Sequence, residues 1–207
     1  MAGCTMPERG RVGILISGRG SNMVSLVEAM RGGGIDAEPV VVVSNDPEAE
    51  GLRRAVEFGI STEVVDHRTV KPRRAHDTAV VEVLRRYDVD LVCLAGYMRL
   101  LTPVMVEAFR HRMLNIHPSL LPSFPGLHAQ RQALDYGAKV AGCTVHFVDE
   151  ECDHGPILLQ AAVPVLDDDT ERSLSRRILE QEHLIYPRAV SLFFKGVHVE
   201  GRRAQPA

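Results

Sequence analysis

The chain has 207 residues, of which 45% are hydrophobic and 25% are charged, and its formal net charge is −3. This length fits one domain that buries roughly 70% of the surface of its unfolded chain, so folding requires neither disulfides nor a structural metal. The slightly acidic charge argues against duplex nucleic acid as a partner. The apolar runs are too short to cross a membrane, and the first residues lack the apolar stretch of a secretory signal.

The first half of the chain alternates between two apolar patterns. Strands are predicted over residues 12–16, 39–44, 62–65 and 90–95. Helices are predicted between them, from Ser21 to Gly32, from Pro47 to Phe58 and from Pro72 to Tyr87. This alternation predicts a single-domain, Rossmann-like α/β fold with a mostly parallel sheet and helices on both faces.

The second half is less regular. Strands are predicted over residues 113–117, 141–148 and 157–165, and short helices over 102–111 and 129–136. The polar residues 167–170 supply caps for a long final helix, which we expect Pro187 to kink or break. We expect the tail after Gly201 to be frayed. No repeat or linker divides the sequence, so we predict one domain over residues 1–207.

Cysteine use indicates the compartment. Four cysteines occur, without a Cys-x-x-Cys pair: Cys4, Cys93, Cys143 and Cys152. Cys93 and Cys143 lie in apolar runs, as buried small hydrophobic residues do. The sequence therefore favours a reducing compartment, and we expect a cytoplasmic protein.

A glycine-rich segment, residues 18–22, follows the first predicted strand and begins a helix. Glycine lets the backbone approach a ligand closely, and a helix N-terminus offers free N–H groups to an anion. Met23 occupies the third glycine position of the dinucleotide fingerprint, and no Gly-Lys-Ser/Thr sequence occurs. The segment therefore predicts a small phosphate site, and the alternative is a plain turn capped by Ser21.

Three polar groups later in the chain are candidates for chemistry. Asn115 and His117 point to the same side of a predicted strand, where an amide can stabilise an oxyanion and an imidazole can move a proton. Asp153 lies in a loop between strands, and a carboxylate beside His117 would raise the pKa of the imidazole. Glu182 lies in the last helix. The structural alternatives are a core histidine, an acidic hairpin and a solvated helix face.

Other catalytic patterns are missing from the sequence. It contains neither Gly-x-Ser-x-Gly nor His-Glu-x-x-His. The spacing of five histidines matches no compact ligand set, so we expect no metal site: His111, His117, His128, His146 and His154.

Taken together, these motifs resemble the phosphoribosylglycinamide formyltransferases, a family of purine biosynthesis. The shared segments are residues 17–22, 95–101, 114–122, 125–128, 144–148, 153–156 and 181–183. The Asn115-x-His117 pair with Asp153 is shared by formyltransferases that use 10-formyltetrahydrofolate. Residues 20–22 and 181–183 are more particular to this family.

The resemblance implies formyl transfer from 10-formyltetrahydrofolate, as co-substrate, to the amine of glycinamide ribonucleotide. It implies a catalytic set of Asn115, His117 and Asp153. The implied ribonucleotide-binding residues are Gly20, Ser21, Asn22, Pro118 and Glu182. The implied folate-binding residues are Arg73 (or its neighbour Arg74), Met98, Arg99, Leu100, Leu101, Val106 and Asn115, with Met113 as further apolar wall.

The family pattern also divides the chain. The resemblance implies a phosphate-binding part over about residues 11–100 and a folate-binding, catalytic part over about residues 101–200. It implies a monomer or homodimer with two small-molecule substrates and no nucleic-acid or membrane partner. Leu179 departs from a position that is polar in bacterial members, and His154 stands where glycine is common.

The implied mechanism begins with attack of the substrate amine on the formyl carbon. We expect Asn115 and protonated His117 to stabilise the tetrahedral oxyanion. Asp153 would keep His117 charged and help to move a proton from the amine to the leaving folate nitrogen.

Relatives with the same core remain alternatives. A methionyl-tRNA formyltransferase would add a β-rich domain and a basic surface, and a formyltetrahydrofolate hydrolase usually adds an N-terminal regulatory domain. We expect neither addition in a chain of 207 residues with a charge of −3. A noncatalytic nucleotide-binding module is a third alternative, but it has no reason to keep Asn115, His117 and Asp153 together.

Overall fold

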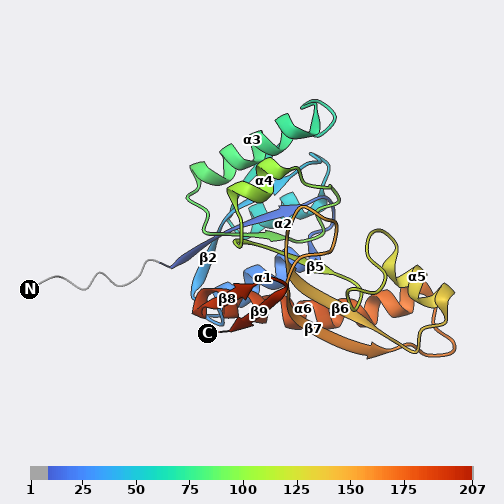
Figure 1. Ribbon diagram of the computed structural model, residues 1–207. Helices are drawn as coiled ribbons and strands as arrows, with labels where there is room; N and C mark the ends of the chain where they lie inside the picture. Colours follow the sequence, from blue (N-terminus) through green and yellow to red (C-terminus); the bar gives the residue numbers. More distant parts are fainter. Residues whose placement is uncertain (1–8, 207) are drawn as a thin grey trace, which may run out of the picture.

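The computed structural model describes residues 9–206 and contains one nine-stranded sheet over this range (Figure 1). The strand order is β3-β2-β1-β4-β5-β6-β7-β9-β8. The strands are β1 (Gly10–Ile16), β2 (Ala37–Ser44), β3 (Ser61–Val64), β4 (Leu91–Leu94), β5 (Met113–His117), β6 (Val140–Phe147), β7 (Ile157–Pro164), β8 (Val197–Glu200) and β9 (Arg203–Pro206). The helices are α1 (Ser21–Arg31), α2 (Glu50–Glu57), α3 (Arg73–Arg86), α4 (Pro103–Ala108), α5 (Ala129–Tyr136) and α6 (Glu171–Lys195).

The sheet is mostly parallel, as the sequence predicts. Strands β1 to β5 pair in parallel, whereas β6 runs antiparallel to both β5 and β7. The switch at β6 needs no helical crossover, because antiparallel neighbours can be joined by a loop. The α/β fold predicted from the alternating pattern is therefore confirmed.

Helices cover both faces of the sheet and form two cores (Figure 1). Along β1 the side chains alternate, so that Ile14 packs with α1 and α6 while Leu15 packs with α3 and α4. Both side chains are fully buried. Apolar contacts on both faces hold the central strands in place. The polar motifs follow these strands, so their position at one edge of the sheet is held as well.

Helix α2 begins later than the sequence predicts. Its first residue is Glu50, and Pro47 precedes it in a turn. The Asp46 side chain accepts the N–H of Glu48 at 3.0 Å, and its carbonyl accepts the N–H of Ala49 at 3.2 Å. An aspartate followed by proline favours such a turn, so this local bonding takes the place of the first helical turn.

Pro187 is expected to kink or break the last helix, but helix α6 is continuous through this residue and does not break there. Proline has no N–H to donate to the carbonyl of His183, four residues earlier. Ser25 of α1 donates its hydroxyl to that carbonyl at 2.9 Å. A neighbouring helix thus replaces the missing hydrogen bond.

Residues 203–206 form strand β9, whereas the sequence predicts a frayed end after Gly201. Strands β8 and β9 form an antiparallel hairpin, and Ile157 of β7 pairs with Arg203 of β9. Gly201 has a φ of 55° at the two-residue turn, a conformation that glycine adopts readily.

Cys93 and Cys143 are free and buried, Cys152 is free and exposed, and Cys4 lies outside the described residues. Within residues 9–206, every helix is too short or too polar to cross a bilayer.

Candidate active site

The polar motifs meet at the carboxyl ends of β1, β4 and β5. These strands are neighbours and parallel, so the segments that follow them lie at the same edge of the sheet. Ser17 joins the first two segments directly: its N–H donates to the carbonyl of Gly96 at 3.1 Å, and its hydroxyl accepts the N–H of Met98 at 2.8 Å. Motifs about 80 residues apart in sequence therefore form one surface.

Asn115, His117 and Asp153 are brought together, as the sequence predicts. Asn115 and His117 come from the same side of β5, and Asp153 comes from the loop between β6 and β7. Nδ1 of His117 lies 3.3 Å from Oδ2 of Asp153. The Asn115 amide donates to Oδ1 of Asp153 at 3.4 Å.

His146 is a fourth member that the sequence analysis considered only as a metal ligand. It pairs with Asn115 across β5 and β6 and is 2% exposed. Its Nδ1 donates to the carbonyl of Phe147 at 2.8 Å, which leaves Nε2 to accept the Asn115 amide at 3.2 Å. The same Nε2 lies 3.7 Å from Asp153. The alternation of β6 was visible in the sequence, but its register against β5 was not.

Asp153 is held as a carboxylate. Burial raises its pKa, but the nearby His146 ring, the N–H of Gly126 at 2.8 Å and the charge that His117 can carry outweigh burial. The net result is a pKa of about 2, below the usual value for aspartate. The side chain is therefore ionised at neutral pH.

His117 differs from the prediction. Burial lowers its pKa, and this effect exceeds the opposite influence of the Phe124 carbonyl and Asp153. Burial, which leaves the side chain only 7% exposed, thus opposes the charged form of His117 that the sequence leads us to expect, whereas Asp153 favours that form. Nε2 donates to the carbonyl of Phe124 at 2.9 Å, so Nδ1 of the neutral ring is the proton acceptor.

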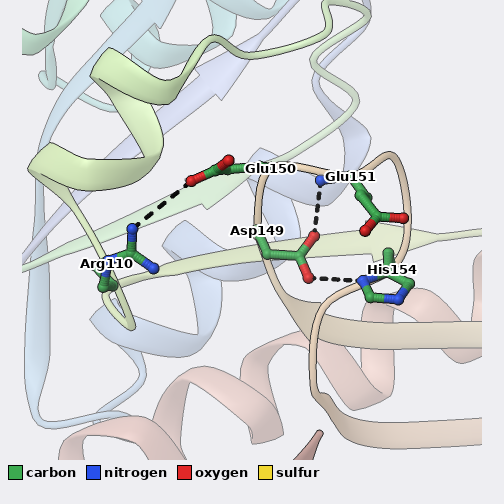
Figure 2. A pocket seen from close by; sticks show the side chains of 5 residues that line it. All are labelled: Arg110, Asp149, Glu150, Glu151 and His154. Carbon is green, nitrogen blue, oxygen red and sulfur yellow. Dashed lines mark hydrogen bonds and ion pairs between the residues drawn. The ribbon is translucent and has the colours of Figure 1, made fainter. Parts of the chain in front are cut away.

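The loop that carries Asp153 encloses a surface pocket of about 190 Å³ (Figure 2). Asp149 accepts the N–H of Glu151 at 3.1 Å and Nδ1 of His154 at 2.9 Å. Glu150 forms an ion pair with Arg110 at 3.8 Å. His154, which departs from the family pattern, therefore closes this loop onto itself.

The glycine-rich segment has the geometry of an open helix N-terminus. Gly20 is the N-cap residue of α1, with a φ of 71° and no side-chain cap. The alternative of a turn capped by Ser21 is therefore wrong. A Cβ on Gly20 would lie 3.0 Å from the Cα of Gly51, so the close approach of α2 also requires glycine. The first N–H groups of α1 are left for an anion.

Glu182 is buried beside this segment and is not on a solvated helix face. It is 7% exposed, and its carboxylate accepts the Asn22 amide at 2.7 Å. Burial raises the pKa of Glu182, and Asn22 opposes that rise. One turn later, the hydroxyl of the buried Tyr186 donates to the carbonyls of Leu94 and Leu114 and so fixes α6 against β4 and β5. No pattern in the sequence indicates this role of Tyr186.

The predicted folate-binding residues fall into two groups. Met98 and Leu100 are 68% and 56% exposed, and Arg73 and Arg74 are exposed at the start of α3. By contrast, Val106 and Met113 are each 1% exposed and pack in the second core. The expectation that the last two line a pocket wall is therefore not met by the structure. Arg99, Leu101 and Pro118 are partly buried.

Histidine side chains are common metal ligands. Over the described range, residues 9–206, no three His, Cys, Asp or Glu side chains are grouped to hold a metal ion.

Comparison with known proteins identifies the family. Residues 10–190 match the family model described as formyl transferase. The chain belongs to the formyl transferase family. The family resemblance stated from the sequence is thereby confirmed.

Solved structures agree with the formyl transferase assignment. The crystal structure of glycinamide ribonucleotide transformylase 1 from Symbiobacterium toebii is 51% identical, with a TM-score of 0.96. The match covers 100% of this chain and 98% of that one.

Curated formyl transferase relatives are of two lengths. The phosphoribosylglycinamide formyltransferase of Escherichia coli is 44% identical over 183 residues, which cover 88% of this chain and 86% of that protein. The trifunctional purine biosynthetic protein adenosine-3 of Drosophila melanogaster is 50% identical over 190 residues, or 91% of this chain. The chain spans only 14% of the length of that relative.

Proposed function

We propose that this chain transfers the formyl group of 10-formyltetrahydrofolate to the amine of glycinamide ribonucleotide, a step of purine biosynthesis. The observation that carries the proposal is the group of Asn115, His117 and Asp153 beside the open N-terminus of α1. The names of the similar proteins point to the same reaction. The free, buried thiols of Cys93 and Cys143 suit a reducing, cytoplasmic setting.

The ribonucleotide binds at the ends of β1 and α6 in this proposal. Its phosphate accepts N–H groups of Gly20, Ser21 and Asn22, because the helix N-terminus carries a partial positive charge. A chain with a net charge of −3 has no general positive field, so capture of the anion depends on these local donors. Glu182 accepts the ribose hydroxyls, and Pro118 contacts the substrate next to His117.

The folate binds across the segment after β4. Met98 and Leu100 offer exposed apolar surface, while Arg99 and Leu101 offer backbone polar groups. Arg73, exposed at the start of α3, attracts the acidic part of the folate by its positive charge. The formyl group then lies between this segment and Asn115. Folate acts here as a co-substrate, and the chemistry requires no metal.

Proton transfer follows from the charge states of the site. The amine nitrogen attacks the formyl carbon, and the carbonyl oxygen becomes an oxyanion that accepts a hydrogen bond from the Asn115 amide. Neutral His117 takes the proton of the amine at Nδ1, and the carboxylate of Asp153, at 3.3 Å, stabilises the resulting imidazolium. The C–N bond to folate breaks as that proton passes to the folate nitrogen. Holding two substrates side by side removes much of the entropic barrier.

The test is an assay with glycinamide ribonucleotide and 10-formyltetrahydrofolate, run beside a reaction without the amine. Formylated ribonucleotide should form only when both substrates are present, and the Asp153→Asn variant should lose this activity. Folate hydrolysis at the same rate without the amine would overturn the proposal in favour of a hydrolase. A lack of any folate turnover would favour a binding module.

A further inference from the structure

The segment between β4 and α4, residues 95–102, presents apolar side chains without regular secondary structure of its own. Tyr97 is 8% exposed, whereas its neighbour Met98 is 68% exposed and Leu100 is 56% exposed. Exposed apolar side chains on a loop lose conformational freedom when a ligand binds, unless the loop is already held. The hydrogen bonds that attach this segment to the rest of the fold therefore determine how much conformational freedom is lost when a ligand binds.

The start of the segment is tied to the end of β1. The hydroxyl of Ser17 accepts the Met98 N–H at 2.8 Å and itself donates to Oδ1 of Asn45 at 2.5 Å. The N–H of Ser17 donates to the Gly96 carbonyl. These bonds join the segment to the phosphate side of the site.

The end of the segment is tied to α3 by one buried carboxylate. Asp77 is 1% exposed, and its Oδ2 accepts both the N–H of Thr102 at 2.6 Å and the hydroxyl of Thr102 at 2.7 Å. Thr102 is the N-cap residue of α4, yet its hydroxyl makes no cap hydrogen bond. A threonine at this position usually caps its own helix, so its use by Asp77 indicates a role in holding the segment.

Asp77 is itself fixed by its neighbour. His76 is fully buried, and its Nε2 donates to the carbonyl of Val65, directly after β3, at 2.8 Å. Its Nδ1 lies 3.4 Å from Oδ1 of Asp77. Burial raises the pKa of Asp77, but the contact with His76 and the hydrogen bonds from Thr102 lower it overall, so a charged acceptor faces Thr102.

We propose that Asp77, through its two hydrogen bonds to Thr102, is a positioning residue that holds residues 98–101 in the conformation that binds the folate ring. This inference rests on the proposed function, because it takes the folate to bind at that segment. Asp77 touches neither substrate. Its effect is on the affinity for folate, because a segment that is held in place loses less entropy on binding.

The test uses three variants at this contact and one matched control. Asp77→Asn keeps the size and one acceptor but removes the charge, Thr102→Ala removes only the hydroxyl, and Thr102→Ser restores it. The control is Thr78→Ala, the next residue of α3, which is exposed and whose hydroxyl bonds only within the helix to Arg74. Initial rates give kcat and the KM of each substrate.

The KM for 10-formyltetrahydrofolate should rise about tenfold in Asp77→Asn and about threefold in Thr102→Ala, since a charge-assisted hydrogen bond is worth more than a neutral one. It should stay at the wild-type value in Thr102→Ser and Thr78→Ala. The KM for the ribonucleotide and kcat should change by less than about twofold, which a general structural loss would not allow. Hydrogen exchange at the amides of residues 98–102 should become faster in Thr102→Ala, a readout that does not require turnover.

One result would overturn the positioning role of Asp77, and a different result would overturn the proposed function. An unchanged folate KM in both Asp77→Asn and Thr102→Ala, in well-folded protein, overturns the positioning role. Leu100→Asp serves as the check on the folate site itself, because it places a charge on the exposed apolar surface. If Leu100→Asp leaves the folate KM unchanged, the placement of folate in the proposed function is wrong, whatever Asp77 does.

Discussion

His117 points Nδ1 at Oδ2 of Asp153 over 3.3 Å while its Nε2 is bound to the Phe124 carbonyl. The Phe124 contact fixes the tautomer, since a carbonyl oxygen only accepts. The Asp153 contact stabilises the imidazolium once a proton arrives. Together they give a ring that is neutral before the reaction and charged during it, and this property leads to the first two predictions.

Replacing Asp153 by asparagine should lower kcat by about 10²- to 10⁴-fold, the usual range for a residue that supports proton transfer. Substrate KM values should change little, because the charge is needed mainly in the transition state. Steady-state kinetics measure the effect. Glu151→Gln, an exposed change on the same loop, is the control. A loss of no more than about threefold in Asp153→Asn would contradict the role.

The pH profile should report the lowered pKa of His117. Catalysis needs the neutral ring, so kcat/KM should fall on the acid side with a midpoint below about pH 6.5, the usual value for histidine. Asp153, with a pKa of about 2, stays ionised across this range and therefore causes no second change in kcat/KM with pH. Rates measured from about pH 5 to 8 test this expectation, and a midpoint above about pH 7 would contradict it.

The same shift has a consequence for stability. Because the pKa of His117 is lower in the folded state, the unfolded chain binds more protons, and the free energy of unfolding should fall as pH drops through about 6.5. His117→Gln should reduce this slope. Urea unfolding at several pH values measures it, with His128→Gln, at an exposed histidine, as the matched control. Equal slopes in the wild type and His117→Gln would count against the assignment.

The sequence predicted the regular parts of the fold well because burial sets their pattern. Strand β5 and helix α5 match their predicted bounds. The β8–β9 hairpin was missed, since its strands have only four residues each and β9 is mostly polar. His146 and Asp77 were missed as site residues for a different reason. Their roles depend on strand register and on contacts between distant elements, which no local pattern encodes.

Glycine at position 20 should be required by the backbone. Gly20→Ala introduces a side chain at a φ of 71° and 3.0 Å from Gly51, so we expect a loss of about 1–2 kcal/mol or more in the free energy of unfolding. Gly18→Ala is the matched control, because its Cβ meets no atom within 4 Å. Thermal unfolding of the two variants should therefore separate them clearly. Equal melting temperatures would argue against this close approach.

Glu182 should matter for the ribonucleotide more than for the fold. Glu182→Gln keeps an acceptor for Asn22 and removes a buried charge, so the melting temperature should stay the same or rise. The KM for glycinamide ribonucleotide should rise about tenfold, because hydrogen bonds from the ribose to a charged acceptor are stronger. Glu180→Gln, exposed on the same helix, should change neither quantity. A normal ribonucleotide KM in Glu182→Gln would remove this residue from the proposed site.

Ser25 and Pro187 should be energetically coupled although they do not bond to each other. Ser25→Ala leaves the His183 carbonyl without its donor and should cost about 1 kcal/mol of stability. In a Pro187→Ala background the alanine supplies an N–H to that carbonyl, so the same change should cost clearly less. A double-mutant cycle on the free energy of unfolding measures the difference. If Ser25→Ala costs the same in both backgrounds, the hydroxyl does not replace the helical hydrogen bond that proline removes.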